Sequence, residues 1–298
     1  MNRTRITVST LVLTATLALS AQALQGQRTV TAEERARRQA EQERSVQEEL
    51  LMERPVAALN SVWIEELTWI EVRDAIASGK TTVIIPTGGV EQNGPYVATG
   101  KHNYILQTGC EMIARELGNA LCAPIIKLVP EGNIDEPSGH MRYPGTISLR
   151  EETYRAVLAD VGASLQAHGF EHIIYIGDSG GNQPGQAAVA EELNQRWGQT
   201  IAHHIPEFYD NNGLIEYMEK ELGITEPVDD GYHDYYWITV LMMVTDPEVV
   251  RYDQRVAAGK ATINGVSIAP KEEAIEVGRK LHQWRVDQTA QAIRAAIR

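Results

Sequence analysis

The chain has 298 residues, of which 43% are hydrophobic and 22% are charged, a composition typical of a globular protein. Its net charge is −13, from 27 basic and 40 acidic residues. A surface that binds nucleic acid leaves a basic footprint, and no Lys/Arg block is present in the body of this chain. We therefore expect no nucleic-acid partner.

Residues 1–23 have the pattern of a secretory signal peptide. Arg3 and Arg5 precede an apolar stretch from Val8 to Leu19, and Ala21-Gln22-Ala23 resembles a cleavage site. A membrane anchor is the alternative, but this apolar run is short for a membrane span. We expect an exported protein, periplasmic or secreted, without membrane contact once the signal is removed.

Residues 24–60 form a charged leader, rich in Glu, Arg and Gln, which we expect to be helical or disordered. No apolar heptad is sustained there, which argues against a coiled coil. Residues 61–298 are predicted to form one domain. Its two cysteines, Cys110 and Cys122, either form a disulfide, which export permits, or are both buried thiols.

Predicted helices and strands alternate along this domain. A capping-box pattern opens a helix at Thr68–Glu71, and a second such pattern lies at Ser148–Glu151. The expected strands are Thr81–Pro86, Leu121–Val129, His172–Ile176 and Thr200–Ile205. The expected helices after the first strand are Asn103–Leu117, the segment opened by Ser148, Gln186–Trp197, Leu214–Leu222, Tyr235–Val244 and Glu272–Ile297, with a loop or hairpin over residues 251–269. This alternation predicts an α/β fold with a mainly parallel sheet and helices on both faces.

Three loops that follow predicted strands carry most of the candidate functional groups. They span residues 87–103, 130–146 and 177–182. The carboxyl ends of parallel strands share one edge of the sheet, so these loops can converge there. The candidate side chains on them are Glu91, Asn93, His102, His140, Asp178, Ser179 and Asn182.

The motifs in these loops resemble the creatininase (creatinine amidohydrolase) family. They are P-x-G-x-x-E-Q-x-G-P at residues 86–95, P-G-T-I-S-L at 144–149 and G-G-N at 180–182. The resemblance covers roughly residues 61–245 and implies a single-domain creatininase-like sandwich. It also implies hydrolysis of non-peptide C–N bonds in small, often cyclic, amides, with one or two ions such as zinc or manganese. Members of the family assemble as homo-oligomers, often hexamers.

The chain departs from this family at its metal ligands. Glu91 is the one usual ligand that is kept. Asn93 and Ser179 stand where the family has histidine ligands, and His102 stands where it has the bridging aspartate. Ile238 replaces a glutamate, whereas His140 and His233 match family histidines. The resemblance therefore implies either a rebuilt site or a lost one.

We expect a rebuilt site to hold one zinc or manganese ion through Glu91, His102 and Asp178, a mixed N/O ligand set. Such an ion would polarise the amide carbonyl and lower the pKa of bound water. Glu91 or His233 would move protons, and Ser179 would shape the pocket or stabilise the oxyanion. The expected substrate-binding residues are Asn93, His140, Asn182 and Trp237.

Each assignment has a structural alternative. Glu91 could pair with Lys101, His102 could cap a helix, and Asp178 could be a helix N-cap. His168, His172 and His282 are expected to be surface or cap residues. At the level of function, the alternatives are a catalytically silent small-ligand-binding protein and a metal-free hydrolase that uses Ser179 as nucleophile with His102 as base.

Overall fold

The computed structural model describes residues 30–298, so the predicted signal peptide lies outside the described residues. The chain divides into two compact units, one ending at Pro55 and the other running from Val56 to Arg298. In the first unit, α2 (Ala32–Leu50) begins with a capping box and buries none of its residues. Among the described residues, no helix is both long and apolar enough to cross a membrane.

The second unit is organised around a parallel sheet with the strand order β2-β1-β3-β4. Its strands are β1 (Thr82–Thr87), β2 (Ala120–Cys122), β3 (His172–Gly177) and β4 (Ala202–His204). All six residues of β1 are buried, as the unbroken apolar run of a central parallel strand predicts.

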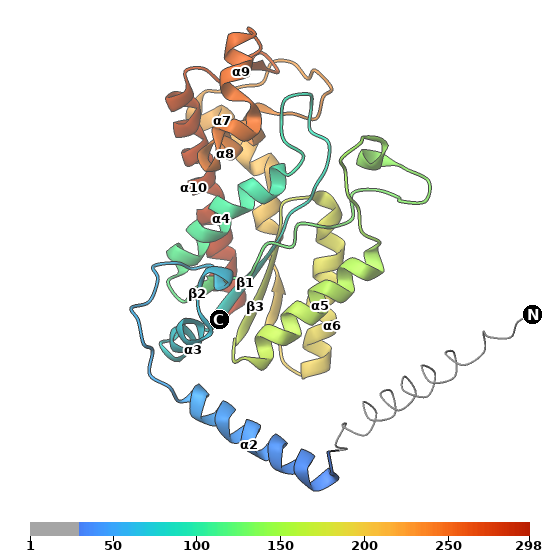
Figure 1. Cartoon of the computed structure of the whole chain (residues 1–298). Helices are drawn as coiled ribbons and strands as arrows, with labels where there is room; N and C mark the ends of the chain where they lie inside the picture. The colour runs from blue at the N-terminus through green and yellow to red at the C-terminus, as the bar shows by residue number, and fades with distance from the viewer. Residues whose placement is uncertain (1–29) are drawn as a thin grey trace, which may run out of the picture. The chain divides into compact units, whose positions relative to one another are not determined.

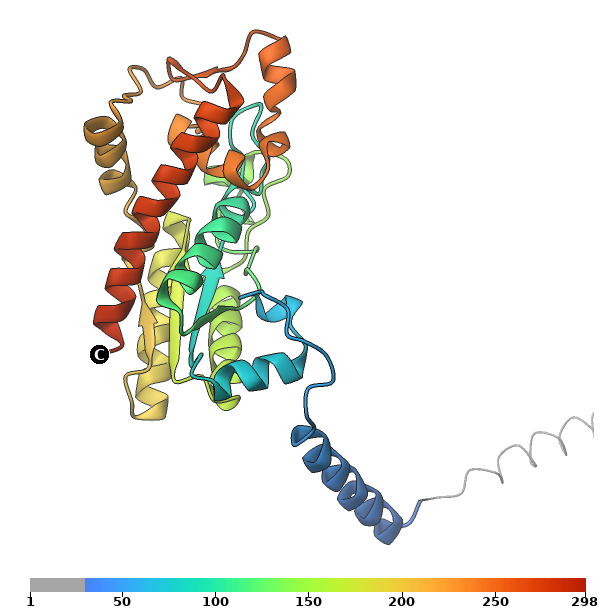
Figure 2. The ribbon, with the colours of Figure 1, turned by 90° about the vertical axis from the view of Figure 1, so that its left-hand side faces the viewer.

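Helices cover both faces of this sheet. Figures 1 and 2 show α4 (Lys101–Leu117) and α10 (Lys271–Ala296) on one face, and α5 (Glu151–Ala167) and α6 (Gln183–Trp197) on the other. The predicted α/β class, with a mainly parallel sheet between two helical layers, is therefore confirmed. The helix α3 (Trp69–Ala77) precedes β1 and begins with the capping box predicted at Thr68.

A second hydrophobic cluster lies beyond the carboxyl ends of the strands, toward the amino-terminal end of α10 (Figure 1). It is formed by α7 (Asn211–Leu222), α8 (Tyr236–Thr245), α9 (Tyr252–Ala257) and the hairpin β5–β6 (Thr262–Ile263 and Val266–Ser267). The predicted loop or hairpin over 251–269 thus contains a short helix before the hairpin. Short 3-10 turns are η1 (Ile64–Glu66), η2 (Gly139–Arg142), η3 (Gly180–Asn182), η4 (Pro206–Tyr209) and η5 (Pro247–Val250).

Cys110 and Cys122 form a disulfide, with their Cα atoms 6.3 Å apart. The bond joins α4 to β2, the edge strand that follows it in the chain. It settles the question that the sequence left open between a disulfide and two buried thiols.

Two predicted local structures are wrong. The strand expected over Leu121–Val129 ends at Cys122, and beyond it only isolated bridges form, because Pro124 has no N–H to donate to a ladder. Ser148 does not cap α5, whose N-cap is Arg150. The Ser148 hydroxyl instead accepts from the Glu131 backbone N–H and donates to the Gly132 carbonyl, which fixes the loop between β2 and α5.

His282 is not the surface or cap residue that the sequence suggested. It is 1% exposed on α10, and its Nε2 donates to the Leu241 carbonyl at 3.1 Å. Burial lowers the pKa of His282 to about 4, so its imidazole is neutral at ordinary pH.

Candidate active site

The three strand-end loops converge on one cavity of about 450 Å³. Glu91 comes from the loop after β1, Glu131 from the loop after β2, and Asp178 directly follows β3. His140 on η2 and His233, just before α8, complete the wall. The cavity lies where ligands bind in open parallel sheets, outside the carboxyl ends of the strands.

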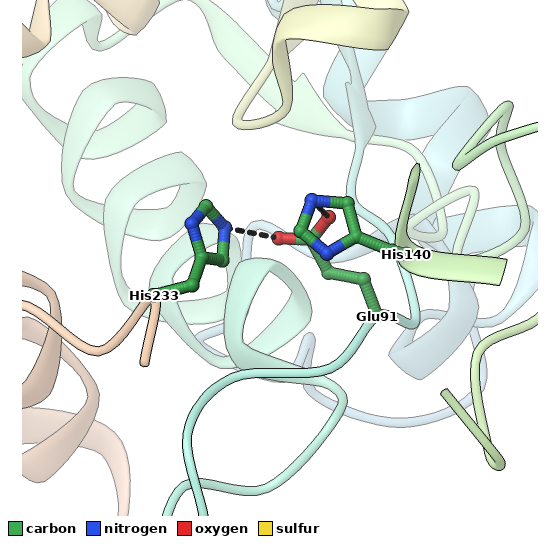
Figure 3. A group of neighbouring side chains, drawn as sticks. All are labelled: Glu91, His140 and His233. Carbon is green, nitrogen blue, oxygen red and sulfur yellow. Dashed lines mark hydrogen bonds and ion pairs between the residues drawn. The ribbon is translucent and has the colours of Figure 1, made fainter. Parts of the chain in front are cut away.

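The carboxylate of Glu91 is the centre of this cavity. It is 3% exposed, and its backbone N–H donates to the Thr99 carbonyl at 2.8 Å. Figure 3 shows the carboxylate between the imidazoles of His140 and His233. His140 Nε2 lies 3.1 Å from Oε2, and His233 Nε2 lies 3.2 Å from Oε1.

Two further nitrogens reach the same carboxylate from the first turn of α4. Lys101 Nζ lies 2.8 Å and His102 Nε2 lies 2.9 Å from Glu91 Oε1. Burial alone would raise the pKa of Glu91, but the hydrogen bond from His102 and the charges of His102 and Lys101 hold it well below its ordinary value. Glu91 is therefore ionised, accepts hydrogen bonds from Lys101, His102 and His140, and is a weak base.

His102 bridges two carboxylates. Its Nδ1 lies 2.8 Å from Asp178 Oδ2, on the opposite side of the ring from the contact with Glu91. Each carboxylate oxygen accepts, so the ring must donate from both nitrogens. Burial and the charge of Lys101 lower the pKa of His102, but the two carboxylates outweigh them and the pKa is raised. His102 is consequently an imidazolium without a free lone pair.

Lys101 is buried, with 1% of its surface exposed, and lies between Glu91 and His233. Its Nζ is 2.9 Å from His233 Nε2. An ammonium only donates, so the Nε2 of His233 is the acceptor and carries no proton. The backbone of His233 has φ +63°, in the left-handed region that residues other than glycine uncommonly adopt.

The pKa of Glu131 is shifted in the opposite direction to that of Glu91. Burial, followed by the negative charge of Glu91, raises the pKa of Glu131 to about 9, so it is a neutral acid at pH 7. Ser179 Oγ donates to its Oε2 at 3.5 Å, while its Oε1 is buried and has no hydrogen-bond partner among residues 30–298. A side chain at Gly89 would place its Cβ 2.1 Å from this Oε1, so a larger residue there would displace the Glu131 carboxyl group.

Asp178 has both oxygens in hydrogen bonds. Oδ2 accepts from His102, and Oδ1 accepts from Arg285 Nη1 of α10 at 2.8 Å. Arg285 is 1% exposed and also donates from Nη2 to Asn211 Oδ1. These contacts make Asp178 a support for the His102 imidazolium.

The remaining predicted residues divide into two groups. Ser179 and Trp237 line the cavity, and the indole N–H of Trp237 is buried with no hydrogen-bond partner in the described part of the chain. Asn93 and Asn182 are buried outside its lining, where their amides hold the strand-end loops. Asn93 Nδ2 donates to the Glu91 carbonyl, and Asn182 Nδ2 donates to the carbonyls of Thr87 and Gly88.

Sequence reasoning missed Glu131 and Arg285, and it named Lys101 only as an alternative partner of Glu91, a pairing that the structure contains. Each carries a weak signal in the sequence. Glu131 directly follows an apolar run that ends in a proline, and Lys101 adjoins the candidate His102. Arg285 interrupts the apolar stripe of a predicted helix, at a position where a buried charge requires a partner.

Two groups of side chains, considered by distance alone, could hold a metal ion. Ligand-type atoms of Glu91, His140 and His233 all lie within 4.8 Å of one another, and so do those of Glu91, His102 and Glu131. Neither group includes Asp178, for which the metal role stays a prediction.

The hydrogen bonds in the site oppose a metal ion in both groups. His102 has no lone pair to offer, and the one lone pair on His233 Nε2 already accepts from Lys101. The carboxylates of Glu91 and Asp178 also face three cationic side chains, Lys101, His102 and Arg285. In this arrangement the residues do not fit the divalent ion that the family resemblance implies.

The fold and cavity define an α/β protein with several charged side chains around a cavity at the carboxyl edge of its sheet. The family model "Creatininase: Creatinine amidohydrolase" matches residues 65–293, and the chain belongs to the creatininase family.

Individual relatives are distant. A creatinine amidohydrolase from Pseudomonas putida is 23% identical over 221 residues, which are 72% of this chain and 83% of that protein. A 3-dehydro-scyllo-inosose hydrolase from Thermotoga maritima is 26% identical over 129 residues, 43% of this chain and 38% of that protein. The solved structure described as "Creatininase Mn" has a TM-score of 0.57 at 22% identity and covers 79% of this chain and 98% of that chain, a likeness of fold.

Proposed function

We propose that the protein is an exported hydrolase of a non-peptide C–N bond, an amide or cyclic amide, in a small molecule. The proposal rests on one observation. Two buried carboxyl groups face the same cavity, and Glu91 is ionised whereas Glu131 is protonated. Environments that push the pKa values of neighbouring carboxyl groups apart are typical of acid–base catalysis. Family membership supports hydrolysis as the reaction class.

The base in this proposal is His140. Its Nε2 donates to Glu91, which leaves Nδ1 as the acceptor, as in other carboxylate–imidazole pairs. Burial lowers the pKa of His140, so the ring is neutral at pH 7. It takes a proton from the water that attacks the amide carbon.

The acid is Glu131, which is protonated at pH 7. It gives its proton to the leaving nitrogen as the C–N bond breaks, and the products are a carboxylic acid and an amine. The proton that His140 gained then returns to Glu131, and the site is restored. Trp237 lines the cavity and would contact the substrate.

The test is hydrolysis of a panel of small linear and cyclic amides, comparing wild type with Glu131→Gln and His140→Gln. We expect each substitution to lower kcat by about 10²–10⁴-fold with a smaller change in KM. Turnover by wild type that neither substitution reduces would refute these roles. Amides that raise the melting temperature without being hydrolysed would favour the silent binding protein.

The metal-dependent hydrolase with one zinc or manganese ion is the second candidate. The close approach of Glu91, His140 and His233 favours it. A metal ion at this group requires that Lys101 give up its hydrogen bond to His233. Metal analysis of the purified protein tests this candidate. The hydrolase that uses Ser179 has less support, because the Ser179 hydroxyl donates to Glu131 and has no imidazole among its hydrogen-bond partners in the described chain.

Export and assembly belong to the same proposal. The signal-peptide pattern and the disulfide, a bond typical of oxidising compartments, support a periplasmic or secreted location. Fractionation of cells expressing the full chain, with sequencing of the mature amino terminus, tests it. Homo-oligomer formation, expected from the family, is tested by light scattering of the purified protein.

A further inference from the structure

The ammonium of Lys101 lies where two potential metal ligands meet. Its Nζ is 2.8 Å from Glu91 Oε1 and 2.9 Å from His233 Nε2, and these two atoms are themselves 3.2 Å apart. Glu91 and His233 both belong to the ligand group completed by His140. The ammonium therefore competes with a metal ion for the same two acceptor atoms.

The competition has a chemical and an electrostatic part. The Nε2 of a neutral imidazole has one lone pair, which either accepts a hydrogen bond or binds a metal. A divalent ion bound at Glu91 would also approach a buried ammonium at short range, where the repulsion is little screened. Lys101 is held in place as part of the first turn of α4, packed in the protein interior.

We propose that Lys101 is a built-in cation that replaces the metal ion of the family in this chain. An ammonium has three N–H donors, and the described residues accept two of them. The third is available to the carbonyl oxygen of a substrate in the cavity that Lys101 lines. Only this last step rests on the proposed amide hydrolysis.

The experiment is to measure metal binding by wild type and Lys101→Gln. Both proteins are purified without added metal, dialysed against a chelator, and then equilibrated with zinc or manganese. Metal content is read by mass spectrometry, and stability is read by melting temperature. Lys127→Gln, at an exposed lysine of the same unit, is the matched control for loss of one positive charge.

We expect wild type and Lys127→Gln to bind no stoichiometric metal. Lys101→Gln frees the acceptor atoms of Glu91 and His233, so it should bind about one ion per chain. Its melting temperature should rise by about 5–10 °C when zinc is at 100 times its Kd.

Two results would overturn the inference: stoichiometric metal in wild type, or no gain of binding in a folded Lys101→Gln protein. If Lys101→Gln does not fold, the wild-type measurement decides alone, because wild type must stay free of metal and show no melting shift. These readouts need no substrate, so a failure to find amide hydrolysis leaves them intact. Where a substrate is found, chelator should not reduce wild-type turnover.

Discussion

Arg285 and Asp178 form a buried ion pair at 2.8 Å, although 107 residues separate them in the chain. The pair joins α10 to the loop after β3, and through His102 it connects to Glu91. The closing helix is thus part of the support of the active site as well as a cover for the sheet.

Arg285→Met should lower the free energy of unfolding by about 3–5 kcal/mol, because it leaves the buried Asp178 without its cationic partner. Guanidinium unfolding followed by circular dichroism measures the change. Arg279→Met, on the exposed side of the same helix, should change it by less than about 1 kcal/mol. Adding Asp178→Asn to Arg285→Met should recover part of the loss; an unchanged or larger loss would contradict the pairing as its cause.

Glu131→Gln should change how stability depends on pH. The folded protein holds the pKa of Glu131 near 9, above its ordinary value of 4.5, so this group favours folding at low pH. Its contribution is lost as pH rises between these two values, by up to about 1.4 kcal/mol per pH unit. Unfolding free energies at pH 5 and pH 8 should therefore differ less in Glu131→Gln than in wild type. An equal difference in the two proteins would show that folding does not raise the pKa of Glu131.

His282→Gln should make the protein less sensitive to acid. The folded state lowers the pKa of His282 from 6.5 to about 4, so its contribution to stability is present above pH 6.5 and lost as pH falls toward 4. Melting temperatures measured from pH 7 to pH 4 should fall less steeply in the variant. His168→Gln, at an exposed histidine, should follow the wild-type curve, and a parallel curve for His282→Gln would exclude this residue as a source of acid lability.

Replacing both Cys110 and Cys122 with alanine should lower the free energy of unfolding by about 2–4 kcal/mol, because the bond closes a short loop between α4 and β2. Denaturant titrations with and without a reductant measure the effect. Reductant should lower the stability of wild type toward that of the double variant and should leave the variant unchanged. Equal stability of oxidised wild type and variant would show that the bond adds nothing.

The sequence predicted the centre of the candidate site because the strand and loop patterns that mark it lie within short stretches of the chain. Glu91 follows a buried apolar strand in a glycine-rich loop, and Asp178 directly follows another such strand, so both were expected at one edge of a parallel sheet. Family motifs in the same loops identified the fold. Strand periodicity and capping patterns likewise predicted most helices and strands, and they failed where a proline or a competing hydrogen bond intervened, at Pro124 and Ser148.

The partners of each side chain depended on tertiary structure. The sequence offered Lys101 as a partner of Glu91, but lysine is rarely buried, and nothing in the sequence placed it in the interior against His233. Likewise, the two carboxylates that flank His102 come from different loops, and Arg285 comes from the closing helix.

By itself, then, the sequence determined the α/β fold, the family and the edge of the sheet where the chemistry lies, because strand and loop patterns are local. Only the tertiary structure decided which groups are charged, which lone pairs are free, and that an ammonium lies between Glu91 and His233. Charge and hydrogen-bond occupancy depend on distances between residues remote in the chain, and sequence spacing does not specify those distances.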